Sequence, residues 1–263
     1  MTDRIATALG ASSAARASLL VTYLTAGDPS VAATIELAAT ALAAGADAIE
    51  LGLPTAAARP SGADVGESFR RALADGPPDL WETCERVRAA APAAPLIALA
   101  FSASIEELGW STFLGGLREA GVDALVIADG REPLAMDRVS AAGISPVPVI
   151  RPDTAPRLAA RLETSAGHLS YLALAPTTGG RLDVDRAAGA AAAWRARSAR
   201  PFLAGFGIRT GRDVRALAPH ADGIVVGSEL LRRIRAAAVD ARHDVVVRSV
   251  REWKSACAWP RDP

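Results

Sequence analysis

Residues 45–54 read GADAIELGLP, a glycine turn followed by a short apolar run that leaves through glycine and proline. Strands made of continuous apolar residues are typical of a parallel sheet that is covered on both faces. Similar runs recur along the chain, each followed by a polar or glycine-rich loop and then by an Ala/Leu/Arg segment with helical spacing. This pattern predicts alternating strands and helices.

Eight such units are expected. The expected strands are 19–24, 48–51, 96–101, 124–128, 145–149, 170–173, 202–204 and 223–226, and the expected helices are 31–44, 64–74, 80–91, 111–120, 131–141, 155–165, 184–196 and 212–218. With no linker rich in Pro, Gly or Ser between them, the units favour a single (β/α)₈ TIM barrel over residues 1–263, with a short helix near residues 2–15 across its base. A doubly wound fold is the alternative, but its G-x-G-x-x-G motif is lacking.

Composition excludes several classes of function. The 263 residues are 50% hydrophobic, too apolar for a disordered chain, and 29 basic residues balance 29 acidic ones, so neither nucleic acid nor an anionic membrane is an expected partner. Lys254 is the lone lysine, which argues against a Schiff base, and the three histidines and two cysteines lack metal-ligand spacing. We expect no metal or cofactor. Without a long apolar run or a signal-like N-terminus, we expect a cytoplasmic protein.

Glycine turns follow the last two expected strands. Residues 205–210 read GFGIRT and residues 227–230 read GSEL, at the position where barrels commonly bind phosphate through backbone N–H groups and a helix N-terminus. The sixth loop, PTTGGR at 176–181, is placed to close the same cup. The alternative is that these are ordinary turn glycines, and Glu229 would compete with an anion unless it points outward.

Two carboxylates end expected strands. Glu50 lies within an apolar run, where an ionised carboxylate must be paired, have a raised pKa or face a cavity, so it is a candidate general acid/base. A structural ion pair with an arginine is the alternative. Asp129 follows the fourth strand, and for it a helix N-cap or a loop turn is as good an interpretation as a functional role.

Five segments in this order resemble the tryptophan synthase alpha chain family. They are YLTAGDPS at 23–30, GADAIELGLP at 45–54, AGVDALVIAD at 120–129, GFGIRT at 205–210 and ADGIVVGS at 221–228. The resemblance implies a TIM barrel that cleaves indole-3-glycerol phosphate to indole and glyceraldehyde 3-phosphate by a cofactor-free retro-aldol reaction. It also implies a small phosphorylated substrate and a β-type partner chain.

The resemblance assigns roles to individual residues. Glu50 matches the glutamate that shuttles protons between the indole C3 and the glycerol hydroxyl, and Tyr171 falls near an active-site tyrosine. The phosphate-binding backbone positions correspond to Gly179, Gly207, Gly227 and Ser228. Phe101 stands where a Tyr/Asn-containing motif is expected after the third strand, and we place it with Asp129 in the expected substrate pocket.

The loop after the second strand departs from the family. The family usually reads PFSDPLADGP, whereas residues 54–63 read PTAAARPSGA. Ser61 therefore takes the place of a second catalytic carboxylate that holds the indole N–H, and Ala57 and Ala58 replace an Asp-Pro pair used in contacts with the β chain. Asp64 and Glu67 are candidate substitutes for that carboxylate, or ordinary residues of a first helical turn.

Three hypotheses follow from this departure. The chain is an alpha-chain-type lyase, active or impaired, on indole-3-glycerol phosphate, a related barrel for another phosphorylated substrate, or a non-catalytic binder or regulator of a β-type partner. A hydroxyl is not ionised near neutral pH, so Ser61 cannot balance the charge that develops on the indole nitrogen.

Overall fold

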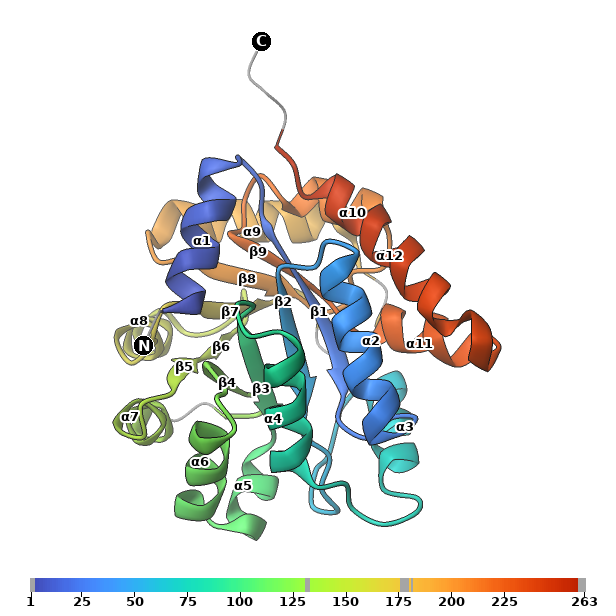
Figure 1. Cartoon of the computed structure of the whole chain (residues 1–263). Helices are drawn as coiled ribbons and strands as arrows, with labels where there is room; N and C mark the ends of the chain where they lie inside the picture. The colour runs from blue at the N-terminus through green and yellow to red at the C-terminus, as the bar shows by residue number, and fades with distance from the viewer. Residues whose placement is uncertain (1–2, 131–132, 176–179, 181, 260–263) are drawn as a thin grey trace.

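The computed structural model describes residues 3–130, 133–175, 180 and 182–259. In this part of the chain, parallel strands join one sheet in the order β5-β4-β3-β2-β1-β9-β8-β7-β6 (Figure 1). Their bounds are β1 Leu19–Thr25, β2 Ala48–Gly52, β3 Leu96–Ala100, β4 Ala124–Ile127, β5 Ser145–Val147, β6 Val149–Ile150, β7 Ser170–Ala173, β8 Phe202–Gly205 and β9 Gly223–Val226.

The expected strand 145–149 is observed as two short strands, β5 and β6, on either side of Pro148. Proline has no N–H to donate, so the ladder is interrupted there. β5 pairs with β4, β6 pairs with β7, and the Pro148 carbonyl accepts a 2.9 Å hydrogen bond from the amide of Tyr171. The two ends of the sheet order therefore meet at this segment, and the expected (β/α)₈ TIM barrel is confirmed.

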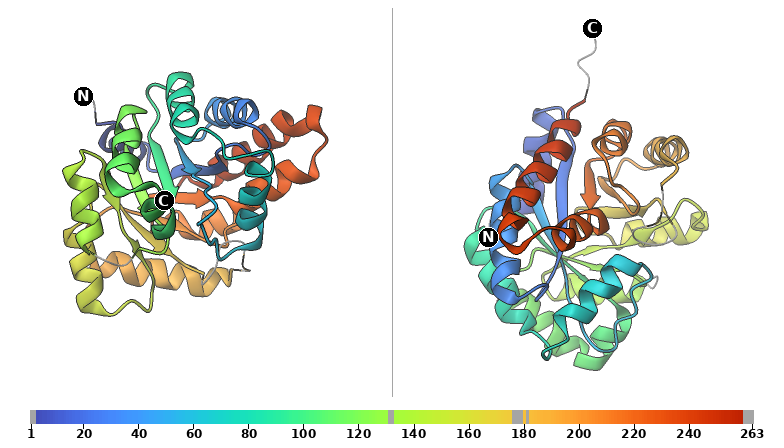
Figure 2. Two further views of the ribbon diagram at one scale, coloured as in Figure 1. Left: turned by 90° about the horizontal axis from the view of Figure 1, so that it is seen from below. Right: turned by 90° about the vertical axis from the view of Figure 1, so that its right-hand side faces the viewer.

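Helices surround the sheet on its outer face (Figure 2). Their bounds are α1 Arg4–Ala14, α2 Val31–Ala43, α3 Ala63–Ala72, α4 Leu80–Ala90, α5 Ser102–Leu108, α6 Trp110–Glu119, α7 Pro133–Ala141, α8 Pro156–Thr164, α9 Val184–Arg197, α10 Gly211–Leu217, α11 Ser228–Ala236 and α12 Arg242–Ala256, with a 3₁₀ turn at Val239–Ala241. The expected helices are present within a few residues of their bounds. The short α5 and the long α12 were not expected. None of the helices that the structure describes is long and apolar enough to cross a membrane.

The core has an outer and an inner part. Alternate residues of a strand point to opposite faces, and in β1 Leu20 and Leu24 pack against the helices while Val21 and Tyr23 point into the barrel. On β2 the same alternation sends Ile49 and Leu51 outward. Glu50, which lies between them, therefore points into the barrel.

Structural ion pairs lie at the amino end of the barrel. Asp47, Asp123 and Asp222 each precede a strand, and each accepts from a backbone amide at the start of a neighbouring strand. Their basic partners are Lys254 for Asp47, Arg88 and Arg4 for Asp123, and Arg195 for Asp222. The lone lysine therefore lies at the end of the barrel opposite to the end where catalysis is expected.

The N-terminal helix α1 lies at this same end. Ile5 belongs to the apolar cluster inside the barrel, and Arg4 pairs with Asp123 at the start of β4, with 2.9 Å between Nη1 and Oδ1.

Candidate active site

A cavity of about 490 Å³ lies at the carboxyl end of the strands. It is lined by every sequence-predicted site residue that the structure describes: Glu50, Ser61, Phe101, Asp129, Tyr171, Gly207, Gly227 and Ser228. Gly179 lies outside the described residues. These residues come from the loops and ends of six different strands, and barrel closure brings them to one place.

Glu50 is the most deeply buried carboxylate in this cavity, with 2% of its surface exposed. In the described part of the chain, its Oε1 atom is buried and has no hydrogen-bond partner. Burial raises the pKa of Glu50 from 4.5 to about 8. The alternative of a structural ion pair with an arginine is wrong within the described residues, because no cation there pairs with Glu50.

Two buried tyrosines share the inside of the barrel with Glu50. Tyr23 is the register partner of Glu50 on β1, and Tyr171 lies on β7. Burial, and secondarily the Glu50 charge, raises the pKa of Tyr171; both causes also raise the pKa of Tyr23, whose hydroxyl lies 3.2 Å from Thr25 Oγ1. Tyr23 is not among the site residues expected from the sequence, although the alternation of side chains along β1 places it inside the barrel.

The glycine loops that follow β8 and β9 also line the cavity. Gly207 has a φ of +79°, a conformation that L side chains rarely adopt, and a Cβ there would lie 3.1 Å from the carbonyl oxygen of Gly180. Gly227 is the N-cap of α11, where a Cβ would lie 3.0 Å from that of Tyr23. Because Gly227 has no side chain, it cannot supply a capping group, and no side chain at the N-cap bonds the first backbone amides of α11. Glycine is therefore required by the backbone at Gly207, and a side chain at Gly227 would be crowded against Tyr23.

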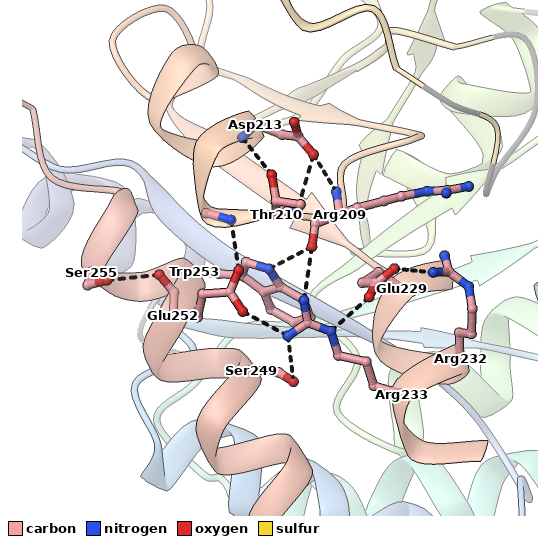
Figure 3. A network of polar contacts seen from close by, with 11 residues as sticks. Arg209, Thr210, Asp213, Glu229, Arg232, Arg233, Ser249, Glu252, Trp253 and Ser255 are labelled. Atoms are coloured by element: carbon pink, nitrogen blue, oxygen red, sulfur yellow. Dashed lines mark hydrogen bonds and ion pairs between the residues drawn. The ribbon is translucent and has the colours of Figure 1, made fainter. Parts of the chain in front are cut away.

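Glu229, in the first turn of α11, does not present an uncompensated charge. It is 9% exposed, its Oε1 accepts from Arg233 Nε at 2.8 Å, and its Oε2 pairs with Arg232 (Figure 3). The two guanidinium groups therefore reduce the repulsion between the Glu229 carboxylate and an anion bound near the start of α11.

The apolar and acidic side of the cavity holds Phe101 and Asp129. Phe101 packs edge-to-face on Phe69, with ring centroids 6.0 Å apart. Asp129 Oδ1 accepts from the amide of Ser102 at 2.8 Å and from its hydroxyl at 3.1 Å. Asp129 therefore holds the first residue of α5 from a later loop while it lines the cavity, a contact that differs from an N-cap, which would bond the helix that follows Asp129 in sequence.

The changed loop after β2 places Ser61 at the cavity wall, exposed to solvent. Arg59 lies in the same loop and lines the same wall, and its Nη1 donates to the carbonyls of Ala56 and Ala58 at 2.7 and 2.9 Å. The loop thus presents a hydroxyl and a guanidinium rather than a carboxylate.

Neither candidate substitute carboxylate takes the place of the missing one. Asp64 and Glu67 lie on α3 and pair with arginines of α11, Asp64 with Arg232 and both with Arg235. They are ordinary charged residues of a helix, and neither lines the cavity.

Several lining residues were missed from the sequence. Besides Tyr23 and Arg59, they include Arg151, Asp153, Phe206 and Arg209. Only their position could have predicted a place in the cavity, since each of these four lies within a few residues of the end of a strand.

The comparisons with known proteins agree with this geometry. The family model described as tryptophan synthase alpha chain matches residues 10–257. The chain belongs to the tryptophan synthase alpha chain family. A tryptophan synthase alpha chain of Burkholderia pseudomallei is 35% identical over 226 residues, 83% of each chain, and one of Bordetella parapertussis is 33% identical over 266 residues, 96% of this chain and 93% of the relative.

Solved structures of this family share the fold. The tryptophan synthase subunit alpha of Legionella pneumophila superposes with a TM-score of 0.86 at 24% identity, covering 98% of this chain and 99% of that one. A chain of Mycobacterium tuberculosis tryptophan synthase also gives a TM-score of 0.86, at 20% identity, covering 99% and 100%. At these identities the likeness establishes the barrel and nothing finer.

Proposed function

We propose that this chain cleaves indole-3-glycerol phosphate to indole and glyceraldehyde 3-phosphate by a cofactor-free retro-aldol reaction, with impaired turnover. Family membership supports the reaction class, because the relatives are tryptophan synthase alpha chains. The observation that carries the proposal is Glu50, a deeply buried carboxyl group in the cavity with a pKa near 8 and an unpartnered oxygen among the described residues.

The raised pKa gives Glu50 both proton-transfer roles in turn. At neutral pH the carboxyl group is protonated and donates its proton to C3 of the indole ring. The bond between C3 and the glycerol chain then breaks, and its electron pair restores the aromatic ring. The hydroxyl on the adjoining glycerol carbon releases its proton to the Glu50 carboxylate as the aldehyde forms, so Glu50 ends as it began.

The impairment follows from Ser61. Protonation at C3 places positive charge on the indole nitrogen, and a neutral hydroxyl stabilises that charge less than a carboxylate would. Loss of one such electrostatic partner typically lowers turnover by about 10² to 10³-fold.

The phosphate of the substrate is assigned to the glycine loops. We place it against the backbone amides of Gly207, Gly227 and Ser228, with Gly179 as a fourth position outside the described residues. The start of α11, which no side chain at its N-cap bonds, and the glycines Gly207 and Gly227, at which the backbone can come close to a ligand, suit an anion. Tyr171 is assigned a place beside the reacting carbons, and Phe101 and Asp129 line the pocket for the indole ring.

A β-type chain is the proposed partner, because alpha chains of this family function with one. We propose that the coupling is weak, since Ala57 and Ala58 offer neither a charge nor a rigid proline to an interface.

The test is an indole assay on the purified chain with indole-3-glycerol phosphate, alone and with a β chain. Slow indole release with weak stimulation is expected. Turnover equal to that of an ordinary alpha chain, with strong stimulation, would contradict the impairment. No indole together with saturable binding of inorganic phosphate would point instead to another phosphorylated substrate. Absence of both, with binding to a β chain, would point to a non-catalytic binder.

A further inference from the structure

The backbone of Arg209 is held from both sides by side chains of helices α10, α11 and α12. Its amide donates to Asp213 Oδ2 at 3.0 Å, and its carbonyl accepts from Arg233 Nη2 at 3.4 Å and from Trp253 Nε1 at 3.1 Å (Figure 3). Arg209 stands two residues after Gly207, at the end of the loop that follows β8. These hydrogen bonds therefore fix the backbone of Arg209 and with it the C-terminal end of the glycine loop.

Arg233 joins that loop to the second glycine loop. Its Nε donates to Glu229 Oε1 at 2.8 Å, and Glu229 directly follows Ser228 at the start of α11. Its Nη1 donates to Glu252 Oε2 at 2.9 Å and to Ser249 Oγ at 3.0 Å, both on α12 (Figure 3). One guanidinium group thus contacts the loop after β8, the first turn of α11 and the helix that packs behind them.

Arg233 also stacks on the ring of Trp253. The guanidinium carbon lies 4.9 Å from the centre of the Trp253 ring, and the indole N–H of that ring donates to the same Arg209 carbonyl. Trp253 is fully buried, so it provides a fixed platform on which the guanidinium is stacked.

We propose that Arg233 is a positioning residue that holds the two glycine loops in register, so that the amides of Gly207 and Ser228 face the same anion. This inference rests on the proposed phosphate site. Arg233 does not itself line the cavity, so its effect passes through Glu229 and the Arg209 carbonyl. Its charge is compensated locally by Glu229 and Glu252, and it therefore acts through geometry more than through attraction of the anion.

The chain offers two matched controls. Arg232 pairs with the same Glu229, whereas the described donors to the Arg209 carbonyl are Arg233 and Trp253, so Arg232→Met removes an equal charge and leaves that carbonyl held. Arg195 resembles Arg233 in its contacts, with an ion pair to Asp222, a hydrogen bond to a carbonyl and a guanidinium stacked on a ring, but it lies at the amino end of the barrel. Arg195→Met therefore reports the loss of stability without a change at the glycine loops.

The experiment measures the Kd for inorganic phosphate by titration calorimetry, and the Tm, for the wild-type protein, Arg233→Met, Arg232→Met and Arg195→Met. Arg233→Met is expected to weaken phosphate binding by up to about tenfold, because it removes the group that joins the Arg209 carbonyl to Glu229 and α12. Arg195→Met should stay within about twofold of the wild type, and Arg232→Met, which also removes one cation beside Glu229, should weaken binding clearly less than Arg233→Met does. With indole-3-glycerol phosphate, Arg233→Met should raise KM more than it lowers kcat.

Trp253→Phe provides a second variant if Arg233→Met does not fold. It keeps a ring beneath the guanidinium and removes one donor to the Arg209 carbonyl, so a weakening of about threefold is expected. If both Arg233→Met and Trp253→Phe bind phosphate as tightly as the wild type does, the positioning role is overturned and the phosphate site stands. Equal weakening in Arg232→Met would overturn it in favour of a charge effect, and no saturable phosphate binding by the wild type would overturn the phosphate site together with this inference.

Discussion

The hydroxyl of Tyr171 lies 2.0 Å from the position that a Cβ on Gly205 would occupy. The two residues stand on neighbouring strands, β7 and β8, and Gly205 is the last residue of β8. A side chain at position 205 would therefore meet the phenol ring directly, and the missing side chain is what leaves room for Tyr171 inside the barrel.

Gly205→Ala should displace Tyr171 and lower turnover. Overpacking of a buried site typically destabilises a protein by about 1 to 3 kcal/mol, and the Tm should fall accordingly. Gly189→Ala is the control, because Gly189 lies in α9 with open space around it, and there alanine should stabilise the helix by about 0.5 to 1 kcal/mol. A variant Gly205→Ala with unchanged turnover would show that the position of Tyr171 does not matter to the reaction.

Glu50→Gln should lower turnover by at least about 10²-fold, because the amide keeps the size of the side chain and cannot transfer a proton. The affinity for inorganic phosphate should be unchanged in the same variant, which serves as the control for folding of the site. In the wild type, turnover should fall as pH rises through about 8, where the Glu50 carboxyl group loses the proton it donates. Normal turnover in Glu50→Gln would remove Glu50 from the mechanism.

The same carboxyl group makes stability depend on pH. Its pKa is raised in the folded state from 4.5 to about 8, so the stability it contributes is fully present below about 4.5 and is lost as pH rises through about 8. At about 1.4 kcal/mol per unit, the loss amounts to a few kcal/mol. Urea unfolding at pH 5 and pH 9 should show a smaller decrease for Glu50→Gln than for the wild type, and equal decreases would argue against the raised pKa.

Ser61→Asp should raise the turnover of indole-3-glycerol phosphate, by up to about 10² to 10³-fold, because in the proposed mechanism it supplies a carboxylate for the charge on the indole nitrogen. Ser61→Asn is the matched control, with a side chain of similar size and no charge. If neither substitution raises a low turnover, the pocket has changed in other places, and Phe101 with Ser102 are the next residues to vary.

Gly207→Val should abolish binding of inorganic phosphate through steric block and reorientation of the amides. Because the φ of Gly207 is +79°, the substitution also destabilises the fold by about 1 to 2 kcal/mol. Gly143→Val separates the two effects, since Gly143 has a φ of +78° and nothing lies within 4 Å of the position that a Cβ there would occupy. The control should lose stability and keep its phosphate affinity; retained affinity in Gly207→Val would exclude this loop from the anion site.

The alternation of strands and helices was predictable because it depends on the spacing of apolar residues that are near one another in the sequence. Each strand needs a short apolar run and each helix a 3.6-residue repeat, and both signals lie within a dozen neighbouring residues. The boundary errors fall where local signals conflict. Pro148 divides one expected strand in two, and α5 begins at Ser102, whose amide and hydroxyl are bonded to Asp129 on a later loop.

By itself, the sequence determined the barrel, the inward carboxylate Glu50 and the glycine turns, because strand alternation and glycine conformation are local properties. The sequence also carries the pairing of Glu229 with Arg232 and Arg233, which lie three and four residues further along the same helix. Only the tertiary structure decided that Glu50 is buried with an unpartnered oxygen among the described residues, and that Asp129 is bonded to Ser102. These two results depend on distances between distant segments that only closure of the barrel sets, and a carboxylate's pKa and availability follow from them.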